Sequence, residues 1–259
     1  MLGYGAVQQG ALENFGRNLD QPSSYLDSLL RILSFDLGKS IDGVPVKSVL
    51  ANSVLLSGTT FIAGLFVVVI IISAGMYFPK IIKTNYMQRA LEFLAFLPGF
   101  VPAFLIFAFL VTINHLEFLN NGLTQKVFIG ISSIVMPTAF SLVTILGVLQ
   151  RESRMPYVRA LRGLGASEAA VMNAIRRAAV IQVVGIFDKV IIQYLSVQIF
   201  AEIVFSAPGF GTVLLLSAQR TDVNMIIPLV IVISLVIVVS RILMELAINF
   251  LDPRDHIEI

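Results

Sequence analysis

The stretch that decides the fold is VLLSGTTFIAGLFVVVIIISAGMYF, residues 54–78, which contains no charged side chain. A helix rises about 1.5 Å per residue, so crossing roughly 30 Å of hydrocarbon takes about 20 predominantly apolar residues. The stretch exceeds that length, and it lies in a longer interval, between Lys47 and Lys80, that is free of charge. We therefore predict a first membrane-spanning helix here.

Comparable apolar runs recur along the chain. They extend from about Leu91 to Ile113, between Lys126 and Arg151, from about Ala178 to Val204, and from about Asn224 to Ile248. Each run can satisfy its own backbone hydrogen bonds as a helix, and none shows the roughly ten-residue alternation of a membrane barrel. The predicted fold class is an all-α, polytopic membrane helical bundle with about five spans.

The composition agrees with a membrane protein. Of the 259 residues, 57% are hydrophobic and 13% are charged, with a mean hydropathy of +0.89, whereas soluble domains carry about 25% charged residues. The net charge of +2 is small and gives no indication of nucleic-acid binding. The absence of cysteine excludes disulfides, thiolate metal sites and cysteine nucleophiles.

Lysine and arginine in the short loops predict the orientation, because such residues concentrate on the cytoplasmic side. The loops after the second and fourth runs carry few of them. The loops after the first and third runs are basic, and we expect them in the cytoplasm together with the C-terminus of a multi-pass cell-membrane protein. Their basic residues are Lys80, Lys83 and Arg89, and then Arg151, Arg154, Arg159, Arg162, Arg176 and Arg177.

This orientation divides the chain into an extracytoplasmic N-terminal segment, residues 1–49, and a transmembrane domain, residues 50–259. The first segment is rich in charged residues and contains neither a span nor a signal peptide that would carry it across the membrane. We therefore expect another span before Met1 in the full-length chain.

The polar loop at residues 151–179, RESRMPYVRALRGLGASEAAVMNAIRRAA, is too polar to span. Pro156 suits a helix start, Gly163 and Gly165 interrupt the helical pattern, and Ser167 can cap a second helix. The pattern predicts a helix, a tight glycine turn and a second helix, a shape suited to docking into a groove on a soluble partner. The alternative is an ordinary basic loop held near anionic headgroups.

Within this loop, YVRALRGLGAS resembles the cytoplasmic EAA loop of permeases of binding-protein-dependent ABC importers, specifically the dipeptide, oligopeptide and nickel permease family. Three further stretches are similar to that family: residues 19–46, EIVFSAPGFG at 202–211, and LDPR at 251–254. One departure is clear. Many members have a histidine shortly after the EAA loop, where this chain has Ile175-Arg176-Arg177.

The resemblance implies a type I importer permease whose family has six spans, so that the first would be absent here. It implies four kinds of partner beside the lipid bilayer: a second permease subunit, two ATPase subunits, an extracytoplasmic binding protein and a peptide-like solute. The chain itself would be non-catalytic and bind no cofactor or metal, with ATP and Mg²⁺ handled by the ATPase subunits. In keeping with this, it contains no G-x-x-x-x-G-K-[ST] phosphate-binding motif. The residues implied in ATPase coupling are Tyr157, Arg159, Arg162, Gly163, Gly165, Ala166, Ser167 and Glu168.

A second set of residues is a candidate for the solute pathway or its gate. Ionisable groups in or near a span indicate such a role by default, although each could instead serve a helix-end contact or, for a lysine, reach the interface. The candidates are Asp188, Gln193, Glu202, Pro208, Gly209 and Gly211. Arg241 and Glu245, spaced i,i+4, are expected to form a structural ion pair.

The rival class is a self-sufficient membrane protein, either an ion-coupled secondary transporter acting without an ATPase or an intramembrane enzyme. A secondary transporter should show internal repeats and functional charges near mid-bilayer, yet no convincing repeat is visible and Asp188 with Lys189 is the only such pair. An enzyme would need a nucleophile and base or a metal cluster in its spans, and the sequence displays none.

Overall fold

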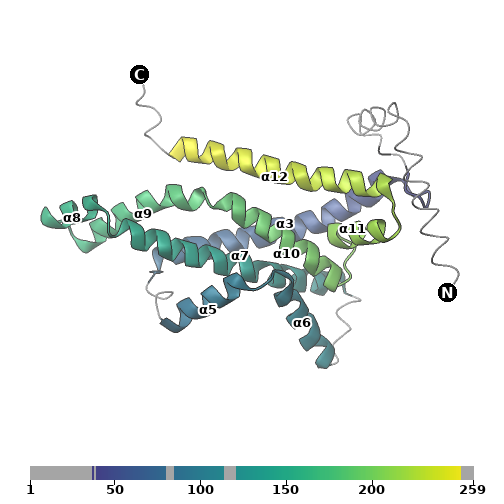
Figure 1. Ribbon diagram of the computed structural model, residues 1–259, viewed down its shortest axis with the longest axis horizontal. Helices are drawn as coiled ribbons and strands as arrows, with labels where there is room; N and C mark the ends of the chain where they lie inside the picture. The colour runs from purple at the N-terminus through teal and green to yellow at the C-terminus, as the bar shows by residue number, and fades with distance from the viewer. Residues whose placement is uncertain (1–36, 38, 80–84, 114–120, 252–259) are drawn as a thin grey trace, which may run out of the picture.

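The computed structural model describes residues 37, 39–79, 85–113 and 121–251. Within this part the chain is helical, and the only strand-like pairing is an isolated bridge between Lys39 and Pro45. The predicted all-α class is confirmed (Figure 1). The described helices are α3 (Val46–Tyr77), α5 (Asn85–Phe96), α6 (Phe100–Thr112), α7 (Gly122–Glu152), α8 (Pro156–Gly163), α9 (Glu168–Val184), α10 (Phe187–Val204), α11 (Phe210–Gln219) and α12 (Val223–Leu251).

Three of these helices, α3, α7 and α12, are long and apolar enough to cross a membrane unbroken. Two further candidates are bent pairs, α5 with α6 at 98° and α9 with α10 at 51°, which gives up to five spans. The predicted number of about five spans therefore agrees with the structure, in which the second and fourth candidates are bent. The protein is a multi-pass membrane protein whose second and fourth candidate spans are each made of two helices.

The break between α5 and α6 has a local cause at Pro98. Proline lacks the N–H that a helix interior requires and turns the preceding residue, Leu97, away from the helical conformation. The next residue, Gly99, lies so close to α10 that an added Cβ would come within 2.6 Å of Val197 Cγ2. By contrast α7 runs through Pro137 without interruption. The two prolines therefore have different effects on their spans.

The break between α9 and α10 corrects the boundary expected at residues 178–179. Helix α9 begins at Glu168, in the polar loop, and continues without a break to Val184. It therefore joins the loop to the membrane-spanning part of the bundle. Asp188 and Lys189 lie in the first turn of α10, directly after the bend, as expected of residues near a helix end.

Helix α7 is the centre of the bundle. In its most apolar stretch 56% of residues are buried, against 28% in α3 and 17% in α12. It packs against α3, α5, α6, α9 and α10. The main core cluster joins α3, α7, α9 and α10 through Val68, Ile145, Ile175 and Val190 among others. Many large apolar side chains of α3 and α12 point outward, as a bilayer requires.

The helices give the bundle two distinct ends (Figure 1). Helix α8 and the turn into α9 project at one end, where α3, α7 and α12 also finish. Helix α11 and the starts of α3 and α12 lie at the opposite end. Any function of the projecting helices is therefore separated from that of α11 by the length of the spans.

Candidate functional site: a projecting elbow and a buried polar junction

Residues 156–171, here called the elbow, form the projecting end of the bundle. Pro156 occupies the start of α8, and Gly165 adopts φ +78°, a conformation that glycine tolerates best, in the turn before α9. The hydroxyl of Ser167 accepts a hydrogen bond from the backbone N–H of Ala170 at 3.3 Å and so caps α9. The predicted helix, glycine turn and capped helix are confirmed.

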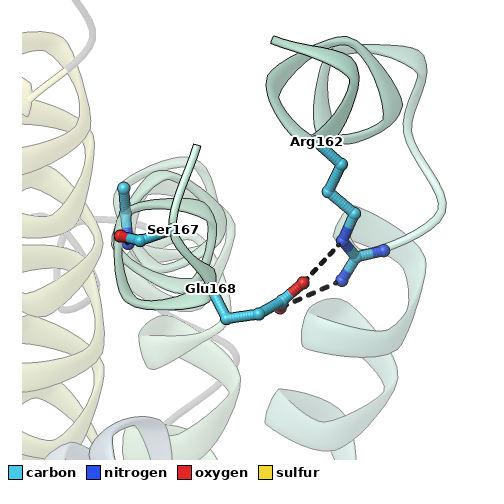
Figure 2. A network of polar contacts seen from close by, with 4 residues as sticks. Arg162, Ser167 and Glu168 are labelled. Carbon is cyan, nitrogen blue, oxygen red and sulfur yellow. Dashed lines mark hydrogen bonds and ion pairs between the residues drawn. The ribbon is translucent and has the colours of Figure 1, made fainter. Parts of the chain in front are cut away.

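A fork of two hydrogen bonds closes the elbow (Figure 2). Arg162, at the end of α8, donates through Nε and Nη2 to the two carboxylate oxygens of Glu168, at distances of 3.1 and 3.4 Å. Both side chains are well exposed, at 50% and 75%, so the pair contributes no more than about 1 kcal/mol. It orients the turn more than it stabilises the fold.

The tip of the elbow carries an apolar side chain. Leu164 is 84% exposed and stands between two glycines, Gly163 and Gly165, at neither of which an added Cβ would meet another atom within 4 Å. Arg159 is also exposed. On the inner side Val158 is completely buried and Ala166 packs against the main core. The elbow thus has one anchored face and one face available to a partner.

Two polar anchors that sequence reasoning missed hold the elbow to the bundle. The first is Glu152, the last residue of α7, which is 5% exposed. Its carboxylate accepts hydrogen bonds from Tyr157 Oη in α8 at 3.0 Å and from Gln182 Nε2 in α9 at 2.5 Å. Burial, together with this carboxylate, raises the pKa of Tyr157 to about 12. The only feature of the sequence that could have indicated this anchor is that Glu152 is an acidic residue between Arg151 and Arg154.

The second anchor is Arg176 in α9. Its guanidinium donates to the backbone carbonyls of Met76 at 3.2 Å and Tyr77 at 2.9 Å, and lies 5.1 Å from the centre of the Tyr77 ring. These carbonyls belong to the last turn of α3, where no further helical N–H is available and where a cation is favoured. Arg176, which lies in the stretch where the sequence departs from the family that it resembles, therefore caps a spanning helix, whereas its neighbour Arg177 is exposed.

At the other end of the bundle, Glu202 is the centre of what we call the polar junction, formed by Ser57, Gln198, Glu202 and Gly211. Its side chain is completely buried, and its carboxylate accepts hydrogen bonds from Gly211 N at 2.8 Å, Gln198 Nε2 at 3.0 Å and the Ser57 hydroxyl. Ser57 in turn accepts from Phe210 N at 2.9 Å. Side chains of α10 and α3 thereby satisfy the first N–H groups of α11.

The glycines of the EIVFSAPGFG stretch are required by close packing. A Cβ at Gly209 would lie 2.5 Å from Glu202 Oε2, and a Cβ at Gly211 would lie 2.1 Å from the backbone oxygen of Ile199. Pro208 is exposed at the turn between α10 and α11. The stretch therefore folds α11 tightly back onto α10.

The candidate pathway residues do not converge in this structure. Asp188 is half-buried and accepts a hydrogen bond from the adjacent Lys189 N at 2.7 Å, and Gln193 is half-buried farther along α10. Asp188 and Glu202 are separated by roughly 20 Å along the helix. Glu202 has the helix-end contacts of a structural group, and Arg241 and Glu245 form the predicted i,i+4 ion pair at 3.4 Å.

A further contact at the same end joins the segment before α3 to the start of α12. The carboxylate of Asp222 accepts hydrogen bonds from Ser40 Oγ, from Ile41 N at 3.3 Å and from Met225 N at 3.2 Å. Arg220 forms an ion pair with Asp42.

Of the stretches that carry the family resemblance, residues 19–36 and 252–254 lie outside the described part. No group of three or more metal-binding side chains occurs among the residues described.

The helices and the elbow define a membrane-embedded subunit that presents a folded surface outside its spans. The chain belongs to the family of binding-protein-dependent transport system inner membrane components, whose model matches residues 67–255. It is therefore a permease component of an ABC importer, as the EAA-like loop predicted.

Several curated relatives have the same kind of role. The chain is 26% identical to the dipeptide transport system permease protein DppB of Bacillus subtilis, over 92% of this chain and 80% of that protein. It is also 26% identical to the oligopeptide transport system permease protein AppB of the same species, over 96% and 85%. The metal-staphylopine import system permease protein CntB of Staphylococcus aureus is 23% identical, over 93% and 80%.

Proposed function

We propose that this chain is one of two permease subunits of an importer for peptide-like solutes. Two separate ATPase subunits drive the importer through the elbow, and an extracytoplasmic binding protein delivers the solute. The observation that carries the proposal is the elbow itself, which is folded, anchored on one face and exposed on the other. The other subunits hydrolyse ATP with Mg²⁺, while this chain is non-catalytic and binds no cofactor.

The chemistry of the elbow supports docking into a groove of a soluble partner. Leu164 supplies an exposed apolar side chain, and the flanking Gly163 and Gly165 allow close approach of the partner's backbone. Arg159 adds a cation beside it. In this proposal Leu164 enters an apolar pocket of the ATPase, and movement of the ATPases rotates the permease subunits between inward-open and outward-open arrangements.

The orientation follows from the same surface. The elbow end contains the arginines of residues 151–177, so we place it in the cytoplasm, together with the end of α12. The polar junction, α11 and the segment 39–45 then face the extracytoplasmic side, as does the N-terminal segment, residues 1–49. Pro208 and the segment 39–45 are among the exposed parts of that end on which a binding protein can act.

The cargo is proposed from the relatives. The names of DppB and AppB specify dipeptide and oligopeptide transport, and that of CntB specifies metal-staphylopine import. We propose that the solute passes between the two permease subunits, with Asp188 and Gln193 of α10 as candidate contacts.

The test is to express the tagged chain with its native operon, purify it in mild detergent and identify what co-purifies. A related permease subunit and an ATPase are expected in the wild-type preparation. Leu164→Asp and Glu168→Arg are expected to reduce ATPase recovery, whereas Glu245→Arg, an exposed acid of α12, serves as the matched control. Recovery of the chain alone, with ATP-independent solute movement in vesicles, contradicts the proposal.

A further inference from the structure

The elbow and helix α9 contact the ends of α7 and α3 through polar side chains. Docking to an ATPase does not require these side chains. Resting on the function proposed above, we infer that Glu152 and Arg176 are positioning residues that make the elbow move together with the ends of α7 and α3. Neither residue is at the tip that would meet an ATPase. Both join the elbow or its helix to a different span.

Glu152 connects three helices at one point. It terminates α7, and its two carboxylate oxygens are used separately, Oε2 by Tyr157 of α8 and Oε1 by Gln182 of α9. A buried carboxylate has little contact with water, so hydrogen bonds from protein donors stabilise its charge. Separating α8 or α9 from α7 would remove one of these hydrogen bonds and destabilise the carboxylate. The carboxylate therefore resists independent movement of either arm of the elbow.

Arg176 connects α9 to α3 in a different manner. It binds backbone carbonyls, Met76 O and Tyr77 O, and its planar guanidinium also covers the Tyr77 ring. Arginine can make both contacts at once because its donors are held in a rigid fork, which lysine lacks. Since the accepting atoms belong to the main chain of α3, displacement of α9 is transmitted to that helix directly.

The two anchors join α9 to different spans, through Gln182 to α7 and through Arg176 to α3. Without them, a push on the elbow could be absorbed by tilting of α8 and the start of α9, whose exposed Arg162–Glu168 pair resists little. With them, the same push reaches α7, the buried centre of the bundle, and α3. The anchors thus determine how much of the ATPase movement becomes movement of the spans.

The experiment uses the complete importer reconstituted in lipid, with Glu152→Leu and Arg176→Met as the disrupting variants. Glu152→Gln keeps an acceptor for Tyr157 and is the conservative rescue. Arg177→Met removes the same charge from the adjacent exposed position and is the matched control. Solute uptake and solute-stimulated ATP hydrolysis are measured beside ATPase co-purification and the KM for ATP.

Both disrupting variants are expected to retain the ATPase subunits and the wild-type KM for ATP, while solute-stimulated hydrolysis and uptake fall at least about fivefold. Glu152→Gln and Arg177→Met are expected to stay within about twofold of wild type. Full stimulation in both disrupting variants overturns the inference. Absence of an ATPase from the wild-type preparation contradicts the proposed function instead.

A second measurement does not depend on assembly. The chain has no cysteine, so spin labels can be attached through Gln150→Cys and Ala169→Cys for the first anchor, and through Ala74→Cys and Ala169→Cys for the second. These positions are exposed in the structure. Each disrupting variant is expected to broaden the distance distribution of its own pair. Unchanged distributions in both pairs overturn the inference even where a variant fails to assemble.

Discussion

The carboxylate of Glu202 in α10 accepts a hydrogen bond from the backbone N–H of Gly211 in α11 at 2.8 Å, although nine positions separate the two residues. The chain reverses between them, and the acid of the first helix caps the second. Ser57 completes the cap from α3. Three helices that cross or enter the bundle at this end therefore depend on one buried side chain.

Replacing Glu202 with alanine is expected to lower the stability of the protein by about 2–4 kcal/mol, because the Gly211 N–H and the Gln198 amide both lose a buried acceptor. Glu202→Gln, which keeps one acceptor oxygen, should lose less. The shift in thermal unfolding midpoint in detergent measures both. Glu245→Ala, at an exposed ion pair, is the control and should change stability by less than about 1 kcal/mol.

Gly211→Ala tests the close approach of α11 to α10. The new methyl group would lie 2.1 Å from the backbone oxygen of Ile199, which cannot rotate away, so a loss of about 1–3 kcal/mol is expected. Gly147→Ala in α7 meets no atom within 4 Å and should be neutral or slightly stabilising, since alanine favours the helix. Equal unfolding midpoints for the two variants would contradict the packing described.

Gly165→Ala tests the turn of the elbow. The space around this residue is open, so the cost arises from φ +78° alone and is about 1–2 kcal/mol. Because the elbow lies outside the spans, the variant should weaken ATPase recovery more than it lowers the global unfolding midpoint. Gly163→Ala, equally open but without a positive φ, should leave the global unfolding midpoint near wild type and so serves as the stability control.

The contact between Glu152 and Tyr157 can be tested by titrating the Tyr157 phenol at high pH. The pKa of Tyr157 is raised to about 12 in the folded protein, against 10 for an ordinary tyrosine. The contribution of this phenol to stability is therefore complete below about pH 10 and is lost as the pH rises toward 12. Subtracting the near-ultraviolet titration of Tyr157→Phe from that of wild type isolates this group among the six tyrosines. A difference curve centred at 10 would mean that the phenol does not contact the carboxylate.

Much of the fold was predictable from charge and length. Long uncharged runs determine where α3, α7 and α12 lie, because lipid admits few other sequences and forces their backbones to be helical. The elbow was also predictable, since Pro156, Gly165 and Ser167 have local conformational preferences that require no knowledge of the rest of the chain.

The remaining features depend on tertiary contacts. The 98° bend beside Pro98 follows from the fit of Gly99 against Val197 as well as from the proline, and a hydropathy pattern does not register it. Glu152 and Arg176 looked like two more charges of a cytoplasmic loop, because their partners are Gln182 and main-chain carbonyls about 30 and 100 residues away. Glu202 suggested a pathway residue by its charge, whereas its contacts are those of a helix cap.

Helix α9 extends without interruption for 17 residues, about 25 Å, from the elbow to the bend at Gly185 and Ile186. In the proposed mechanism this helix is a lever arm that ends at the bend. A displacement of about 2 Å at the elbow corresponds to a rotation of only about 5° at the bend over this length. Lengthening the arm by one residue would turn the elbow by about 100° around the helix axis, so importers with this geometry should tolerate substitutions in α9 far better than insertions or deletions.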